Sequence, residues 1–313
     1  MNITLKQLRT LETIVEEQSY TAAAKTLFMT QPAVSMQIKQ MEEQIGLPLF
    51  ERDGKQVTPT EAGKELLYYA QNIRQQLNEA ANVIEELKGL KRGKLHLTMA
   101  STANYFAPQL IAAFHHEYPA AKVTLDVANR RGLLDALDQN RTDMVIMGRP
   151  PEGHKLLGTP FMDNPLVAIA APSHPLASRR HITLHELADK PFIVREQDSG
   201  TRIAVERFFA RHELSLNIGM EMNRSEAIKQ AVMAELGIGI VSLHTIEMEL
   251  ALKRLVVLNV EDFPILRHWY IVHREGKRFA AIPDAFKTFV LHHAEQLIDI
   301  SHFGTTTTIT PEQ

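Results

Sequence analysis

The fold of the N-terminal part is decided by residues 19–46, which read SYTAAAKTLFMTQPAVSMQIKQMEEQIG. Ser19 can cap a short helix that is rich in alanine, whose small side chain allows close helix packing. Thr30 can cap the next helix, and Pro32 lies in its first turn, where a missing N–H costs little. Gly46 suits the end of that helix. The apolar residues before this stretch recur at helical spacing and predict one more helix.

The helix that follows Thr30 has an apolar face and a small polar face. Gln31, Ser35 and Lys39 share the polar face. Glutamine and serine can hydrogen-bond base edges in the major groove of DNA, and lysine can reach a phosphate. The pattern predicts a helix-turn-helix whose last helix binds DNA. The surface of an ordinary helical bundle would also be polar there, so periodicity alone leaves both interpretations open. The apolar face consists of Val34, Ile38, Met41 and Ile45.

Residues 49–59, LFERDGKQVTP, add a predicted hairpin. Asp-Gly between two short extended runs is typical of a two-residue turn. Directly after a helix-turn-helix, such a hairpin indicates a wing. Arg52 would then reach the minor groove or its phosphates.

Several runs in this region stand in a fixed order and spacing: SYTAAA at 19–24, TQPAVS at 30–35, LFER at 49–52 and TPT at 58–60, with Ile38, Glu42, Gly46, Ala62 and Gly63 between and after them. Together they resemble the N-terminal signature of LysR-type transcriptional regulators. The resemblance implies a winged helix-turn-helix whose helix from Thr30 enters the major groove. Met36 departs from the polar residue that is more usual at its position. The residues that the resemblance places at DNA are Ser19, Thr21, Thr30, Gln31, Pro32, Ser35, Lys39 and Arg52.

A long helix is predicted after Thr60. Its apolar residues recur with a mean spacing of 3.5 residues between Leu66 and Leu87, which is the coiled-coil period. We expect this stripe to pair two chains, although it could instead pack on the C-terminal part of its own chain. Arg74 and its polar neighbours are assigned to the solvated face, and residues 89–94 to a hinge. The stripe consists of Leu66, Tyr69, Ile73, Leu77, Ala80, Ile84 and Leu87.

From Leu95 onward, predicted strands and helices alternate. The strand-helix-strand-helix-strand order over 95–147 predicts a parallel sheet with helices on both faces. Residues 166–242 predict a second lobe, and residues 269–298 return to the first. Two α/β lobes that share two crossovers look like a periplasmic-binding-protein fold. The predicted division is 1–60 for the winged helix-turn-helix, 61–90 for the linker helix, 91–302 for a two-lobed effector domain, and 303–313 for a disordered tail.

In such a fold, ligands bind between the lobes, where strands end and helix N-termini favour anions. Three turns meet this description: residues 100–102, 147–151 and 197–202. Ser101 or Thr102 is also expected to cap the helix that follows. A surface arginine or a capping hydroxyl would produce the same pattern without binding a ligand. The candidate effector-binding residues are Ser101, Thr102, Asn129, Arg149, Ser199, Thr201 and Arg202.

Other chemistry has little support in the sequence. There is no cysteine, and no Gly-x-Ser-x-Gly, His-Glu-x-x-His or phosphate-loop motif. His181 and His185 are four residues apart, but no third metal ligand is adjacent. Gly237-Ile238-Gly239 follows a helix and lacks a third glycine, so we interpret it as a backbone turn. We therefore expect neither an enzyme nor a bound metal or cofactor.

A narrower likeness lies outside the DNA-binding part. The runs NRRGLL at 129–134, MGRPP at 147–151 and WYIVHR at 269–274 are similar to regulators of Calvin-cycle (rubisco) operons. This likeness implies phosphorylated metabolites or NADPH as effectors. The arginines at 130, 131, 149 and 202 suit anions in any case. A LysR-type regulator of another regulon stays open as the alternative.

Net charge gives no hint of these partners. The 313 residues carry 34 basic and 37 acidic side chains, and the first 94 carry 12 of each. DNA affinity must therefore come from where the charges are placed. Expected partners are double-stranded DNA and further copies of the chain, as a dimer or tetramer, with RNA polymerase as another candidate. We expect a cytoplasmic location and no membrane contact. The competing hypotheses are a solute-binding protein or enzyme on the same lobes, and a coiled-coil adaptor.

Overall fold

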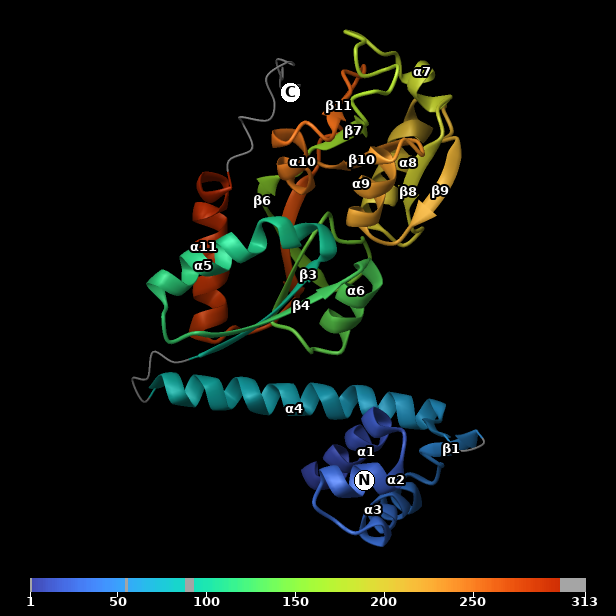
Figure 1. The fold of residues 1–313 in the computed structure, drawn as a ribbon. Coiled ribbons are helices and arrows are strands. Elements are labelled where there is room, and N and C mark those ends of the chain that lie inside the picture. The colour runs from blue at the N-terminus through green and yellow to red at the C-terminus, as the bar shows by residue number, and fades with distance from the viewer. Residues whose placement is uncertain (1, 54–55, 88–92, 299–313) are drawn as a thin grey trace. The chain divides into compact units, whose positions relative to one another are not determined.

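The computed structural model describes residues 2–53, 56–87 and 93–298 (Figure 1). The chain folds as two compact units that divide after residue 88. Each unit has its own hydrophobic core. The predicted hinge and the predicted disordered tail fall mainly outside the described residues.

The first unit is a winged helix-turn-helix with a long helix attached. Thr4 caps the first helix in a reciprocal capping box with Gln7, and Ser19 caps the second through the backbone N–H of Ala22. Thr30 is the N-cap of the third helix, as predicted, but its side chain makes no capping hydrogen bond. The elements are α1 (Leu5–Glu17), α2 (Tyr20–Thr26), α3 (Gln31–Ile45), β1 (Phe50–Asp53), β2 (Gln56–Pro59) and α4 (Glu61–Leu87).

Helix α4 has two different faces, which the sequence analysis did not separate. Leu67 packs against the core of the winged helix, and Ala70 is buried beside it. Arg74, assigned to the solvated face, keeps 52% of its side chain exposed and also places its Nε 2.9 Å from the Glu12 carboxylate of α1. The side chain of Glu12 is only 7% exposed, so this ion pair holds α4 against α1 of the winged helix-turn-helix.

The first lobe of the second unit is a sheet with strand order β4-β3-β5-β12-β6. Strands β3, β4 and β5 are parallel, as predicted from their βαβαβ order. Helices α5 and α11 pack on one face of the sheet and α6 on the other (Figure 1). The elements are β3 (Lys94–Ala100), η1 (Ser101–Tyr105), α5 (Ala107–Glu117), β4 (Lys122–Ala128), α6 (Arg130–Asp138), β5 (Met144–Met147), β6 (Leu156–Asp163), β12 (His268–Arg274) and α11 (Ala281–Leu297).

The second lobe is a sheet with strand order β11-β7-β10-β8-β9. Helices α7 and α8 cover one face, and α9 and α10 the other. Strands β6, β9 and β11 were not predicted. Strand β9 is exposed on both faces, so it lacks the alternation by which a strand is recognised in sequence. The elements are β7 (Leu166–Ala170), α7 (Leu184–Ala188), β8 (Phe192–Arg195), α8 (Gly200–Arg211), β9 (Ile218–Met222), α9 (Ser225–Met233), β10 (Ile238–Ser242), η2 (Leu243–Thr245), α10 (Glu247–Ala251) and β11 (Val256–Val257).

Two crossovers join the lobes and lie side by side. The backbone N–H of Asn164 donates to the carbonyl of Arg267 at 2.7 Å, and Leu166 and Ile265 exchange two backbone hydrogen bonds. The chain thus leaves the first lobe after β6 and returns through β12, which pairs with both β5 and β6. This confirms the prediction that the first lobe resumes after the second.

The Glu12–Arg74 pair leads to a first prediction. Burial raises the pKa of the Glu12 carboxyl, and the charge of Arg74 only partly opposes this. Arg74→Gln leaves that buried carboxylate without its cation, so we expect a loss of about 2 kcal/mol in the free energy of unfolding of the N-terminal unit at pH 7. Thermal unfolding at pH 7 and pH 5 measures it. Because a raised carboxyl pKa costs stability as pH rises, the loss is smaller at pH 5.

The double variant Glu12→Gln/Arg74→Gln is the control, since it removes the buried charge as well as its partner. It should recover most of the lost stability. An Arg74→Gln variant as stable as the wild type at both pH values would contradict the assignment.

A second prediction concerns His244 of η2, which packs against Phe106 and Trp269 of the first lobe at ring-centroid distances of 5.3 and 6.4 Å. The residue is 6% exposed, and burial lowers its pKa to about 4. Between pH 6.5 and 4, the imidazole of His244 therefore binds a proton in the unfolded chain but not in the folded chain. The free energy of unfolding falls as pH decreases through this window. The upper limit of its contribution is about 3 kcal/mol.

His244→Phe keeps a ring in that place and removes the titration. Its free energy of unfolding should fall less steeply between pH 6.5 and 4 than that of the wild type. Identical pH dependence in the two proteins would contradict a buried neutral histidine.

Candidate DNA interface and anion cleft

The winged helix presents α3 as an exposed recognition helix. Thr10 of α1 donates to Gln37 at 2.6 Å, and the Glu42 carboxylate accepts from the backbone N–H of Leu49 at 2.8 Å. These contacts fix α3 against α1 and against the start of the wing. Strands β1 and β2 form the predicted antiparallel hairpin, while its turn at 54–55 lies outside the described residues.

Most residues predicted to meet DNA lie on the surface of this unit. The hydroxyl of Ser19 is occupied as an N-cap, accepting from Ala22 N at 3.3 Å. Nothing is described of the Arg52 side chain, which was predicted to be the wing contact. The exposed members of the predicted set are Thr21, Thr30, Gln31, Pro32, Ser35 and Lys39.

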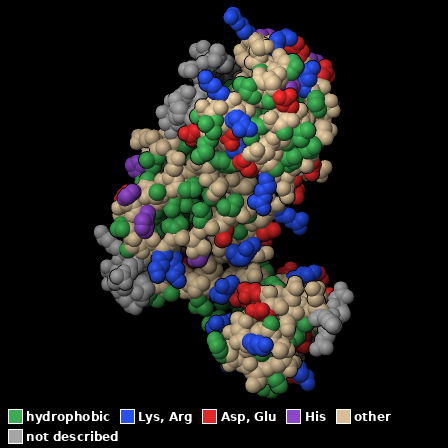
Figure 2. Space-filling model, viewed as in Figure 1, with side chains coloured by type: hydrophobic (Ala, Val, Ile, Leu, Met, Phe, Trp, Pro, Cys, Tyr) green, Lys and Arg blue, Asp and Glu red, His purple; other side chains and the backbone are tan. Residues whose placement is uncertain are grey.

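Lys39 has an acidic neighbour on the same face. Its Nζ lies 3.9 Å from a carboxylate oxygen of Glu43, one turn further along α3. Both side chains are exposed, so this pair contributes little to stability and is easily exchanged for a phosphate. On the face drawn in Figure 2, basic and acidic side chains are interspersed, in keeping with the balanced composition.

The predicted apolar stripe of α4 is exposed after Leu66, which packs against the core of the winged helix. Tyr69, Ile73, Leu77 and Ile84 all keep more than a third of their surface in contact with solvent. A row of large apolar side chains along one helix marks a surface for a partner, since isolated helices seldom leave such a stripe uncovered.

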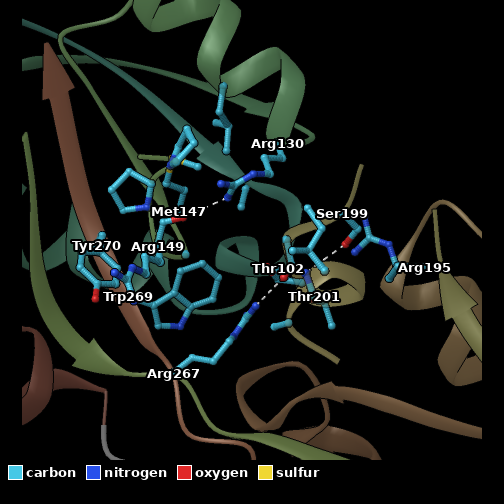
Figure 3. A pocket seen from close by; sticks show the side chains of 18 of the residues that line it. Thr102, Arg130, Met147, Arg149, Arg195, Ser199, Thr201, Arg267, Trp269 and Tyr270 are labelled. Carbon is cyan, nitrogen blue, oxygen red and sulfur yellow. Dashed lines mark hydrogen bonds between the residues drawn. The ribbon is translucent and has the colours of Figure 1, made fainter. Parts of the chain in front are cut away.

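A cleft of about 740 Å³ lies between the two lobes of the second unit (Figure 3). Its walls are the ends of β3 and β5, the start of α6, the N-terminal part of α8 and the second crossover. These are the carboxyl ends of strands and the N-termini of helices, where α/β folds bind ligands.

Arg267 is a half-buried cation of the cleft whose guanidinium is strongly desolvated. Its side chain points from the second crossover toward the start of α8, and its Nη1 donates to the carbonyl of Gly200 at 2.9 Å (Figure 3). Its Nε is buried and has no partner among the described residues. Burial lowers the pKa of this guanidinium to about 10, with a further contribution from Arg130. It is still charged at neutral pH, so the ligand-free cleft holds a desolvated cation with an unused donor.

Arg130 enters the cleft from α6 and donates to the backbone carbonyl of Arg149 at 3.0 Å. Burial lowers its pKa as well, and the neighbouring Arg207 adds to the effect. Like charges therefore face one another across the cleft. An anion bound between Arg130 and Arg267 would relieve this repulsion and supply the missing acceptor.

Acidic residues of the cleft do not neutralise these arginines. Glu196 is held by its neighbour Arg195 through two hydrogen bonds of 2.7 and 2.8 Å, and Glu152 pairs with Arg149 at 3.1 Å. Both carboxylates are thus already matched by other arginines. Within the described residues, Arg130, Arg207, Arg211 and Arg267 line the cleft without forming an ion pair.

Six of the seven predicted effector residues line the cleft, where the structure brings Ser101, Thr102, Asn129, Arg149, Ser199 and Thr201 together. The predicted helix cap at 101–102 is wrong, because a 3₁₀ turn begins there with Ala100 as N-cap and no capping side chain. Ser199 does cap α8, accepting from Thr201 N at 3.3 Å. Asn129 accepts from Gly132 N at 2.9 Å and so orders the start of α6.

Arg202 is not among the cleft-lining residues. Its guanidinium is buried on the other side of α8, where it donates to Glu206 and to the carbonyl of Arg195. Because it follows Thr201 by one residue, its side chain points about 100° away from that of Thr201. Arg202 thus supports the cleft wall rather than facing it.

Sequence reasoning missed the role of Arg267. This residue lies on the crossover, two positions before Trp269, and no capping or phosphate-loop pattern surrounds it. The only feature of the sequence that could have pointed to Arg267 is its position directly before β12, the strand with which the first lobe resumes.

The described residues offer neither a metal site nor a membrane span. No group of three or more His, Asp or Glu side chains is arranged to hold a metal ion. No helix in the described part of the chain is long and apolar enough to cross a membrane.

A winged helix-turn-helix and a two-lobed α/β unit with a ligand cleft together define a class of bacterial transcriptional regulators. A family model described as "Bacterial regulatory helix-turn-helix protein, lysR family" matches residues 5–64, and one described as "LysR substrate binding domain" matches residues 88–295. The chain therefore belongs to the LysR family of transcriptional regulators.

Known relatives narrow this assignment. The chain is 50% identical over 297 residues to a RuBisCO operon transcriptional regulator of Allochromatium vinosum, covering 95% of this chain and 98% of that protein. It is 39% identical to the solved CcmR regulatory domain of Synechocystis PCC6803 in complex with 2-PG, with a TM-score of 0.62, covering 64% of this chain and 97% of that one. A full-length LysR-type regulator, CbnR in complex with target DNA, shares the fold at 19% identity, with a TM-score of 0.69 over 92% of this chain and 99% of that one. The chain is thus closely related to regulators of carbon-fixation operons.

The cleft geometry leads to a third prediction. Arg267→Met removes a cation that is desolvated in the ligand-free protein, so we expect its melting temperature without ligand to equal or exceed that of the wild type. Added inorganic phosphate should raise the melting temperature of the wild type and leave that of Arg267→Met unchanged. Loss of a charge-assisted hydrogen bond costs about 10- to 100-fold in affinity.

The matched control is Arg179→Met, which removes an exposed arginine paired with Glu186 at 3.2 Å outside the cleft. It should respond to phosphate as the wild type does. Equal phosphate responses in Arg267→Met and the wild type would refute the anion site.

Proposed function

We propose that this chain is a transcriptional regulator of carbon-fixation genes whose DNA binding is gated by a small phosphorylated acid in the cleft. The observation that carries the proposal is the pair of half-buried arginines Arg130 and Arg267, which line one cavity and form no ion pair with a carboxylate within the described residues. The relative crystallised with 2-PG supports the ligand class, and the RuBisCO operon regulators support the regulon.

In this proposal Arg267 and Arg130 hold the phosphate, and the hydroxyls and backbone N–H groups at the start of α8 complete its shell. A small molecule that carries both a phosphate dianion and a carboxylate would neutralise the positive charge of the cleft arginines. Arg202 is left out because its donors are already used. NADPH, whose phosphates could reach Arg207 and Arg211, is the second candidate effector. The proposed ligand shell also includes Ser101, Thr102, Asn129, Arg149, Ser199 and Thr201.

DNA binding is assigned to the exposed face of α3 and the wing. Gln31 and Ser35 would meet base edges, Lys39 and Arg52 phosphates, and the predicted roles of Ser19, Thr21, Thr30 and Pro32 are kept. The exposed stripe of α4 would pair two copies of the chain, giving two recognition helices for a two-fold DNA site. The boundaries proposed for these parts are residues 1–60, 61–90 and 91–302.

The test of ligand gating is a titration of the full chain with 2-phosphoglycolate and, separately, 2-phosphoglycerate, the two small acids that the abbreviation 2-PG fits. NADPH is titrated in parallel. Binding measured by calorimetry should be lost in Arg267→Met and kept in Arg179→Met. If none of the three compounds bound to the wild type, the proposed gating would fail.

The test of DNA binding uses DNA from upstream of the chain's own gene. Lys39 and Arg52 in a dimer would displace counterions from about four phosphates, so the logarithm of affinity should fall with the logarithm of salt with a slope of about −4. Gln31→Ala and Ser35→Ala should reduce occupancy. Unchanged occupancy would favour the coiled-coil adaptor, and turnover of a phosphorylated acid by the purified protein would favour the enzyme.

A further inference from the structure

One exposed residue of the recognition helix is not used by the proposed function. Met36 of α3 is 59% exposed, and it is not part of the core formed by Val34, Ile38 and Met41. A single exposed apolar residue is common on protein surfaces and needs no explanation by itself. Its position on this helix is what carries the inference.

Successive residues of a helix are rotated by about 100°, so the exposed face of α3 can be laid out residue by residue. Pro32 and Lys39 run along the middle of that face. Ser35 flanks them on one side and Met36 on the other, at equal angles. Met36 is therefore as central to the exposed face as the serine to which base contact is assigned, and Pro32 lies one turn before it on the same ridge.

The two residues that flank the middle of this face differ in chemistry, and the exposed Gln40 follows Met36 by one turn on the same side. Gln31 and Ser35 carry hydrogen-bond donors and acceptors, whereas Met36 carries a flexible apolar chain and only a weak sulfur acceptor. A thioether cannot compensate a phosphate charge. Among the groups that base pairs display in the major groove, the apolar one is the C5-methyl of thymine. Methionine, which is unbranched and polarizable, can follow the position of such a methyl group.

We propose that Met36 is a specificity-determining residue that reads one thymine in each half-site through its C5-methyl group. This inference rests on the proposed role of α3 as the recognition helix. It adds an apolar contact on one side of the helix to the hydrogen bonds made by Gln31 and Ser35 on the other.

The experiment starts from a duplex selected by the full-length wild-type protein out of a random-sequence library. Failure to select any sequence would count against the proposed DNA-binding function itself, so it is distinguishable from failure of this inference. Each thymine of the selected site is then replaced in turn by deoxyuridine, symmetrically in both half-sites. This change removes the methyl group and keeps the base pair.

Affinities are measured for the wild type, Met36→Ala and Met36→Gln. Alanine and glutamine are good helix formers, so both variants should fold. The matched control is Met248→Ala, which removes a methionine that is 76% exposed on α10. Its affinities should equal those of the wild type on every duplex.

We expect deoxyuridine at one thymine position to weaken wild-type binding about fourfold per half-site, the value of one buried methyl group. Met36→Ala should bind the thymine duplex correspondingly more weakly and lose all sensitivity at that position. The dependence of affinity on salt should not change, whereas Lys39→Gln should reduce the slope by about 1 per half-site. A loss of sensitivity at one thymine with an unchanged salt dependence distinguishes a lost base contact from a general weakening of DNA binding by α3.

Two results would overturn the inference. One is a wild type that is indifferent to deoxyuridine at every position of the selected site. The other is a Met36→Ala variant that keeps the wild-type pattern of sensitivity, because the methyl contact would then come from another side chain.

Discussion

Strand β12 is the constraint on which the second unit depends. The first sheet is complete only with β12, which pairs with β5 on one side and β6 on the other. In the sequence, β12 follows the whole second lobe. The two lobes are therefore tied by two antiparallel crossovers that are hydrogen-bonded to each other near Leu166 and Ile265.

The same topology places Arg267 in the cleft between the two lobes. Arg267 belongs to the returning crossover, so its side chain enters the cleft from the floor and is enclosed by both lobes. Its depressed pKa and that of Arg130 have the same cause, burial, reinforced by like charges. The ligand-free cleft is thus electrostatically unfavourable, and an anion would gain binding energy from relieving it. A ligand that binds one arrangement of the two lobes more tightly than another would shift the balance toward that arrangement.

Local features of the chain were predictable because they depend on neighbours in sequence. The cap at Ser19, the end of α3 at Gly46 and the parallel βαβαβ order follow from patterns within a few turns or one crossover. Arg267 could not be found in this way, because its burial depends on two strands about a hundred residues earlier. The ion pair of Arg74 was not predicted for the same reason, since its partner Glu12 lies on another helix. Arg202 has the right residue type in the right turn, but the helical rotation directs it away from the cleft.

The balanced charge of residues 1–94, which are the N-terminal unit and the six residues after it, bears on how that unit could select its site. A protein that relies on many phosphate contacts gains affinity for all sequences alike. Here the first 94 residues carry no net charge, and Lys39 of α3 has Glu43 at 3.9 Å. We accordingly expect a low affinity for random DNA, with contacts to base edges keeping their full value at the correct site. Because the useful quantity in a genome is the ratio between these affinities, a neutral domain with an informative helix face discriminates better than a basic one. Pairing of two chains through α4 would compensate for the affinity lost without a net positive charge. This gain would arise only at DNA where two half-sites have the right spacing.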